Sequence, residues 1–103
     1  MELKKLEFPS EAYLKDLIEK KQDGIAIRCG TVILKKGEKL PYKTLDYDEI
    51  AYLFSGKLLV YTKAGLKTEM NPGDLIYLHK DEIRETVTLE DSKLLFFLYK
   101  ANL

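Results

Sequence analysis

Histidine and cysteine, two side chains that often act in acid–base, nucleophilic or metal chemistry, are scarce in this chain. Among its 103 residues there is one histidine, His79, and one cysteine, Cys29. His79 can serve as a general base or as a lone imidazole ligand. No Ser or Cys signature accompanies it, so we expect no nucleophilic triad. A single thiol excludes an internal disulfide and a cysteine-based metal site, and Cys29, in an apolar run, is expected to be buried and inert.

Carboxylates gather in one short stretch that contains Asp46, Asp48 and Glu49. Their oxygens could hold a hard cation such as Mg²⁺ or Ca²⁺. In a strand, however, successive side chains point to opposite faces, so Asp46 and Asp48 would face away from Glu49. A solvated acidic turn is therefore our preferred interpretation of this stretch.

The elements that must position these residues are mostly strands. From residue 25 onward, short β-rich runs alternate with turn signals such as Lys63-Ala64-Gly65 and Pro72-Gly73. Strands of about five residues at this spacing predict an all-β sandwich or barrel. The preceding stretch has Leu14, Leu17 and Ile18 at helical spacing and Gly24 as a stop signal. We therefore expect a segment with one short N-terminal helix, residues 1–24, packing on a single barrel domain, residues 25–103.

Composition and charge narrow the functional classes. The chain has 17 Lys and Arg and 17 Asp and Glu residues, a net charge of zero. Non-specific nucleic-acid binding needs a basic surplus, so we expect no nucleic-acid partner. The longest apolar run, Leu94 to Tyr99, is far shorter than the ~20 residues that span a bilayer. Because the N-terminus also lacks a signal-peptide run, we expect a soluble cytoplasmic protein with no membrane partner.

The spacing of glycines and one glutamate is more specific. Gly37 is followed by five residues, then Lys43-Thr44-Leu45, Glu49 after three more residues and Gly56 after a further six. This resembles the first motif of the cupin superfamily, in which Gly, His-x-His, Glu and Gly follow at the same intervals. A second stretch opens on Gly73-Asp74, as the second cupin motif does. The resemblance implies a small single-domain cupin, with the double-stranded β-helix or jelly-roll fold.

The departures from the cupin motifs concern the metal ligands. In metal-binding cupins three histidines and one glutamate hold a transition metal, and the matching positions here are Lys43, Leu45, Glu49 and Arg84. Only Glu49 is retained. Ammonium and guanidinium groups are donors without a lone pair near neutral pH, so they cannot coordinate a metal. The resemblance therefore implies a cupin without a metal or other cofactor.

The same positions suggest what the barrel holds instead. If the cupin register is kept, Lys43, Glu49 and Arg84 face inward, and buried charges need partners. Glu49 can pair with Arg84 or with Lys43, and the remaining cation would favour a small anionic or polar ligand such as a carboxylate or phosphate. The alternative is an ion-pair network that fills the barrel without binding anything.

Three further residues are candidates for the rim of this pocket. Tyr42 and Tyr77 lie in or near strands, where their hydroxyl groups could line a pocket, although packing is the more common role of such tyrosines. His79 falls where cupins place a turn proline, at a strand end near the barrel rim. A structural or surface role is therefore our preferred interpretation of His79.

A narrower resemblance concerns the hairpin Leu45-Asp46-Tyr47-Asp48-Glu49, with Gly56 and the later Pro72-Gly73-Asp74. It is similar to the ethanolamine-utilisation Q-type cupins, which also tend to lack the metal histidines. Their acetate-kinase-like activity is not carried over, because no Gly-x4-Gly-Lys-Ser/Thr phosphate loop is present.

Three functions stay open on these residues. The first is a module that binds a small ligand between Lys43, Glu49 and Arg84. The second is an ethanolamine-utilisation-type or metal-free isomerase or lyase, with Glu49 as catalytic base and Arg84 or Lys43 as electrophile. The third is a non-catalytic structural or regulatory cupin. The resemblance also implies a homodimer formed by sheet packing, to which a net charge of zero is no obstacle.

Overall fold

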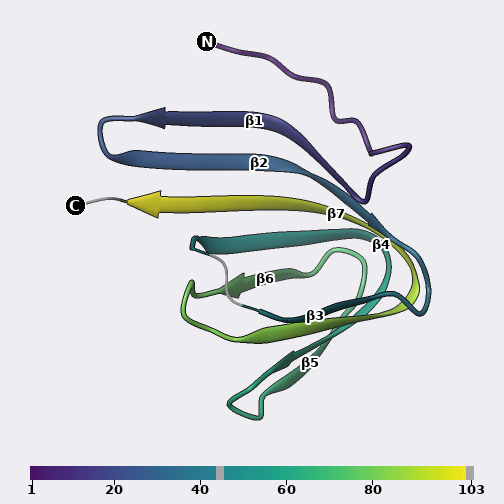
Figure 1. Ribbon diagram of the computed structural model, residues 1–103. Coiled ribbons are helices and arrows are strands. Elements are labelled where there is room, and N and C mark those ends of the chain that lie inside the picture. The colour runs from purple at the N-terminus through teal and green to yellow at the C-terminus, as the bar shows by residue number, and fades with distance from the viewer. Residues whose placement is uncertain (44–45, 102–103) are drawn as a thin grey trace.

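Seven antiparallel strands make up the ordered framework of the protein (Figure 1). The computed structural model describes residues 1–43 and 46–101, with backbone only for residues 41–43. The strands are β1 (Leu14–Gln22), β2 (Ile25–Leu34), β3 (Lys39–Lys43), β4 (Asp48–Thr62), β5 (Lys67–Met70), β6 (Leu75–Leu78) and β7 (Arg84–Ala101). Among the described residues there is no helix, and hence none long and apolar enough to cross a membrane.

The two long central strands, β4 and β7, each take part in both halves of the fold. The second half of β7 pairs with β2 and with the beginning of β4, whereas its first half pairs with β3 and with the end of β4. The sheet order is β1-β2-β7-β4-β5, with β3 added beside β7 and β6 beside β4. Both long strands bend, so the sheet folds over on itself and encloses a core (Figure 1).

The bend in β4 lies where the β4–β7 register shifts, around Gly56. Gly56 has a φ of 97°, a conformation that L side chains rarely adopt. A Cβ atom at this position would also lie 2.6 Å from the Cα atom of Ser92 on β7. The second glycine of the first cupin-like motif therefore serves the close approach of the two long strands at their bend.

The prediction of a helix within residues 1–24 was wrong. Residues 14–22 form β1, which pairs with β2 from Leu14 opposite Val32 to Gln22 opposite Ile25. Asp23 and Gly24 form the two-residue turn with φ values of 53° and 77°, and Asp-Gly is a strong hairpin signal. A register shift between Asp16 and Ile18 interrupts the two-residue alternation of β1. That irregularity explains why the apolar spacing matched a helix.

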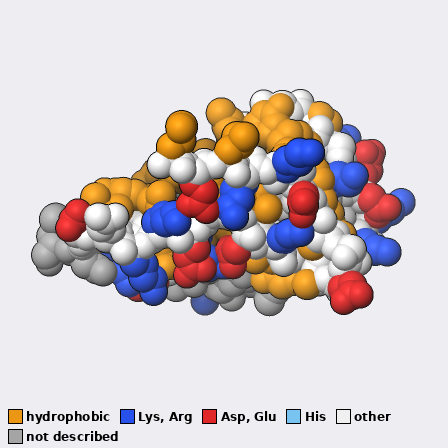
Figure 2. Space-filling model, turned by 90° about the horizontal axis from the view of Figure 1, so that it is seen from above, with side chains coloured by type: hydrophobic (Ala, Val, Ile, Leu, Met, Phe, Trp, Pro, Cys, Tyr) orange, Lys and Arg blue, Asp and Glu red, His pale blue; other side chains and the backbone are white. Residues whose placement is uncertain are grey.

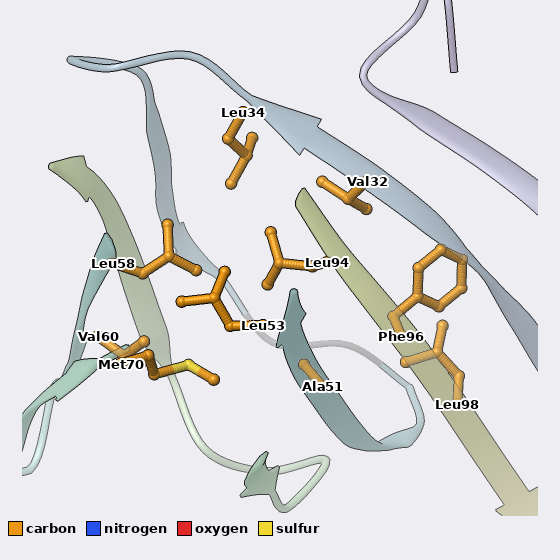
Figure 3. Packing of buried hydrophobic residues seen from close by; sticks show 10 residues of the cluster. All are labelled: Val32, Leu34, Ala51, Leu53, Leu58, Val60, Met70, Leu94, Phe96 and Leu98. Atoms are coloured by element: carbon orange, nitrogen blue, oxygen red, sulfur yellow. The ribbon is translucent and has the colours of Figure 1, made fainter. Parts of the chain in front are cut away.

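The hydrophobic core lies between the two halves of the folded sheet (Figure 3). Alternate residues of β2, β4 and β7 face it, as the pleat of a strand requires. Leu53 and Leu58, on either side of the β4 bend, are essentially inaccessible to solvent. The core residues are Val32, Leu34, Ala51, Leu53, Leu58, Val60, Met70, Leu94, Phe96 and Leu98.

The N-terminal segment before β1 packs on the sheet without forming regular structure. The Phe8 ring packs edge-on against Phe54 at 5.7 Å between centroids, and the Thr31 hydroxyl donates to the carbonyl of Glu7. Seen from above, acidic and basic side chains are interspersed on the side of the molecule where β1 lies, and hydrophobic side chains stand out along one edge (Figure 2). The side with β1 is therefore a mixed-charge surface without a field of one sign.

Candidate functional site

A cavity of about 390 Å³ lies inside the folded sheet. Its volume is within the range of ~300–1,000 Å³ that is typical of small-molecule pockets. Among the described residues, its polar lining comes from Tyr13, Arg28, Glu49, Arg84 and Thr86. The rest of the lining is apolar and comes from all seven strands. It includes Leu14, Val32, Leu40, Ala51, Leu58, Val60, Met70, Ile76, Leu78, Leu94, Phe96 and Leu98.

A buried ion pair between Glu49 and Arg84 forms part of the cavity wall. Nη2 of Arg84 donates to Oε1 of Glu49 at 2.8 Å. The Arg84 side chain is 4% exposed and the Glu49 side chain is 18% exposed. Nη1 of Arg84 donates to the carbonyl of Glu82 at 3.2 Å and, at 3.5 Å, to that of His79. Arg84 thus connects the first residue of β7 to β4 and to the turn that follows β6.

A second ion pair, between Arg28 and Asp16, lies beside the same cavity. Nε and Nη2 of Arg28 both donate to Oδ1 of Asp16, at 3.2 and 2.9 Å, and Nη2 also donates to Oδ2 at 3.0 Å. The guanidinium carbon lies 6.0 Å from the centroid of the Phe96 ring, in cation–π range. The two side chains are 27% and 37% exposed, so this pair is in partial contact with solvent.

Strand register explains why the charges lie close together. Arg28 is opposite Leu98, Leu98 is opposite Glu49, and Glu49 is opposite Leu78. These four residues form one cross-strand row on the inner face. In the next row Ala51 lies between Phe96 and Ile76. Arg28 and Glu49 therefore share one row, whereas Asp16 lies opposite Gly30 in the next row and Arg84 lies opposite Thr62 at the other end of β4.

Sequence reasoning missed Arg28 and Asp16 as site residues. Asp16 was assigned to the predicted helix, where it had no defined partner. The signal for Arg28 was present, because alternation along β2 puts it on the same face as Val32 and Leu34. An arginine on the core face of a strand needs a partner, and the partner is on the strand that was taken for a helix.

The other predicted site residues are not among the side chains that the structure shows to line the cavity. The backbone of Lys43 on β3 lies opposite Arg84, but its side chain and that of Tyr42 lie outside the described residues, as does Leu45. Tyr77 and His79 do not line the cavity. Tyr77 lies between Ile76 and Leu78, which both do, so the pleat turns Tyr77 outward.

The remaining polar candidates make local surface contacts. Nδ1 of His79 accepts from the N–H of Asp81 at 3.2 Å, and about half of the His79 side chain is exposed. Asp48 accepts from the N–H of Lys80, and Asp46 pairs with Lys100. Cys29 is partly buried rather than fully buried, and burial raises the pKa of its thiol, which disfavours the reactive thiolate.

The charged groups of the cavity do not fit the transition metal of metal-binding cupins. Glu49 supplies one carboxylate, and Arg84 occupies the position of an imidazole. A guanidinium offers no lone pair to a metal. Within residues 1–43 and 46–101, no three His, Cys, Asp or Glu side chains come together as a metal-binding group. The chemistry of this site is that of paired charges in an apolar cavity.

A folded antiparallel sheet around an inner cavity, with a partly buried glutamate on the first motif, defines the protein as a cupin. The fold is similar to that of an RmlC-like cupin family protein with a double-stranded β-helix fold from Methanocaldococcus jannaschii, at 17% identity over 99% of this chain and 93% of that chain, with a TM-score of 0.70. It is also similar to a cupin superfamily protein from Desulfitobacterium hafniense, at 14% identity over 89% and 82% of the two chains, with a TM-score of 0.67.

The particular family is that of the ethanolamine utilisation protein EutQ. The model of this family matches residues 5–103, so the chain belongs to it. The structure of the Clostridium difficile EutQ protein is similar at 25% identity, over 88% of this chain and 69% of that chain, with a TM-score of 0.70. A search of curated proteins found no match.

Loss of the buried ion pair should destabilise the fold. Arg84→Met removes the cation and leaves Glu49 without a cationic partner among the side chains that the structure describes. We expect the free energy of unfolding, measured by urea denaturation, to fall by roughly 3 kcal/mol. Lys57→Met is the matched control, because the Lys57 ammonium lies 3.4 Å from Glu69 on the exposed surface and should cost less than about 1 kcal/mol. Equal losses in the two variants would contradict a structural role for the buried pair.

Proposed function

We propose that this EutQ-family cupin binds a small molecule in its inner cavity without a metal ion. The observation that carries the proposal is a cavity of about 390 Å³ with mostly apolar walls and three charged lining residues, Arg28, Glu49 and Arg84. Small-molecule sites have this composition, because apolar walls supply affinity and a few polar groups fix orientation. The ligand is a small molecule with an apolar body and one polar or anionic group.

The charge balance of the cavity supports a ligand of low charge. Among the side chains that the structure describes, Glu49 neutralises Arg84 and Asp16 neutralises Arg28. A ligand with several charges would have to break one of these pairs, which is costly where the groups are buried. Sequence analysis predicted that Lys43, Glu49 and Arg84 bind the ligand. In this proposal Glu49 and Arg84 form an ion pair in the cavity wall.

Glu49 keeps a catalytic alternative open. Its Oε1 atom is bound by Arg84, its side chain lines the cavity, and a carboxylate there can accept a proton from a bound ligand. Membership of the family of the ethanolamine utilisation protein EutQ supports this alternative, in which the protein is an enzyme of ethanolamine utilisation. The test follows by NMR whether the hydrogens on the carbon next to the ketone of 2-oxohexanoate exchange with deuterium from the solvent. Exchange in the wild type that is lost in Glu49→Gln would support catalysis. No exchange above the uncatalysed rate would count against it.

Filling the cavity should abolish binding. Ala51→Leu places a larger side chain in the cavity wall, whereas Ala64→Leu adds the same group in an exposed turn. Isothermal titration of the wild type with hexanoate and with hexan-1-ol should show binding of at least one of the two. We expect the affinity to fall at least about tenfold in Ala51→Leu and to be unchanged in Ala64→Leu.

Two results would contradict the proposal. The first is a wild type that binds neither probe. The second is binding that survives in Ala51→Leu, because the probe would then lie outside the cavity. Circular dichroism melting of both variants checks that the larger side chain is tolerated, since overpacking alone typically costs about 1–3 kcal/mol.

Metal independence is tested separately by elemental analysis of protein purified without chelators. Because Glu49 is the only carboxylate on the cavity wall among the described residues, we expect Fe, Mn, Ni and Zn far below one per chain. Hexanoate titration should give the same affinity before and after treatment with EDTA. A stoichiometric transition metal whose removal abolishes binding would overturn this part of the proposal.

We further propose that two copies of the chain pack through the outer face of the sheet. One cross-strand row there runs through Cys29, Phe97, Ile50 and Tyr77, and none of these side chains is charged. Leu75 and Tyr77 are 69% and 58% exposed on this face. Contiguous exposed apolar surface marks interaction sites, and an uncharged patch on a chain of zero net charge is complementary to itself.

A charge at the centre of this patch should separate the copies. Phe97→Asp buries an unpaired carboxylate in the proposed interface, so sedimentation velocity should show a dimer for the wild type and a monomer for the variant. Lys63→Asp, in an exposed turn, should leave the dimer intact. A wild type that sediments as a monomer at high micromolar concentration would refute the dimer.

A further inference from the structure

We propose that Arg28, held in place by Asp16, is the residue that recognises the anionic group of the cavity ligand, and that this ligand is a monocarboxylate with a short apolar chain. The inference rests on the proposed function and adds the ligand class and the recognising residue. It also assigns Arg84, the arginine that sequence analysis favoured for this role, to a structural one. The hydrogen bonds of the two arginines carry the argument.

The guanidinium of Arg84 is already engaged. Nη2 binds Glu49 and Nη1 binds two backbone carbonyls, and only 4% of the side chain is exposed. An incoming carboxylate would have to displace Glu49 and leave it unpaired in an apolar wall. That exchange returns no net hydrogen bond and buries one more negative charge.

The guanidinium of Arg28 is only partly engaged. Asp16 binds the edge of the guanidinium group that is formed by Nε and Nη2. Among the described residues, none accepts a hydrogen bond from Nη1. A guanidinium has five N–H donors, and Asp16 engages those of Nε and Nη2, so the two N–H groups of Nη1 are available for a ligand carboxylate. At 27% exposure, Arg28 is also the more accessible of the two arginines.

The surroundings of Arg28 define the rest of the ligand. The next row contributes only apolar side chains to the cavity wall, with Phe96 beside the guanidinium and Ala51 beyond it. An apolar chain attached to the carboxylate would lie against these side chains. Glu49 lies on the far side of Leu98 in the same row as Arg28, so a second anionic group would meet a carboxylate. Like charges repel, which favours a monocarboxylate over a dicarboxylate.

The test compares hexanoate with hexan-1-ol and with adipate by isothermal titration at pH 7. The wild type should bind hexanoate more tightly than either of the other two. Arg28→Gln should weaken hexanoate binding roughly tenfold to a hundredfold, the range expected for a hydrogen-bonded charge, and leave hexan-1-ol unchanged. Lys15→Gln, which removes a neighbouring cation on β1 that does not line the cavity, should change neither.

Two further measurements cover a variant that folds poorly. Arg28→Lys keeps the positive charge but removes the planar guanidinium group, and should also lose affinity for hexanoate. In the wild type, the Arg28 Nε–H signal in ¹⁵N NMR spectra should move on addition of hexanoate, and that of Arg84 should stay in place.

The outcomes separate this inference from the proposed function. Tight hexanoate binding that is unaffected by Arg28→Gln, or movement of the Arg84 signal alone, overturns the assignment of Arg28 and leaves a binding cavity. Equal affinity for hexanoate and hexan-1-ol overturns the carboxylate preference. A wild type that binds no probe overturns the proposed function and this inference together.

Discussion

The buried pair of Glu49 and Arg84 is the interaction on which the arrangement of the site depends. It joins the beginning of β4 to the beginning of β7, and through two backbone carbonyls it also holds the turn between β6 and β7. Those two strands run through both halves of the folded sheet. Because neither charge could remain in an apolar wall alone, the pair constrains how β4, β7 and the turn meet at this side of the cavity.

The two arginines that line the cavity differ in how many of their N–H groups are free to bind a ligand, because their hydrogen-bond partners are arranged differently. Arg84 and Arg28 are the same residue type, both paired with a carboxylate and both on the inner face. One has its guanidinium distributed over a carboxylate and two carbonyls, whereas the other is held from one side by Asp16. A charge count treats the two as equal, and only the direction of each N–H bond distinguishes them.

The failure of the helix prediction has a specific physical origin. The β1–β2 hairpin contains a register shift after Asp16, and one extra residue is enough to convert a two-residue apolar alternation into a spacing that resembles a helical face. Asp23-Gly24 was a hairpin signal, but Gly24 was interpreted as a helix stop because both structures need a residue with positive φ there. The error had a consequence for the site, since Asp16 on that strand is the partner of Arg28.

Local patterns in the chain were sufficient for the β-rich architecture and the cupin resemblance. These follow from the two-residue period of a strand and from a glycine–glutamate–glycine spacing, both of which are properties of neighbouring residues. Glu49 had two possible cationic partners in the sequence, and the structure shows it bound to Arg84. The presence of a cavity, the exposure of each charge and the pairing of Asp16 with Arg28 depend on distant segments that meet after the sheet folds over. Side-chain distances and hydrogen-bond directions across strands are set by register and bending, and neither is encoded in the spacing of residues along one strand.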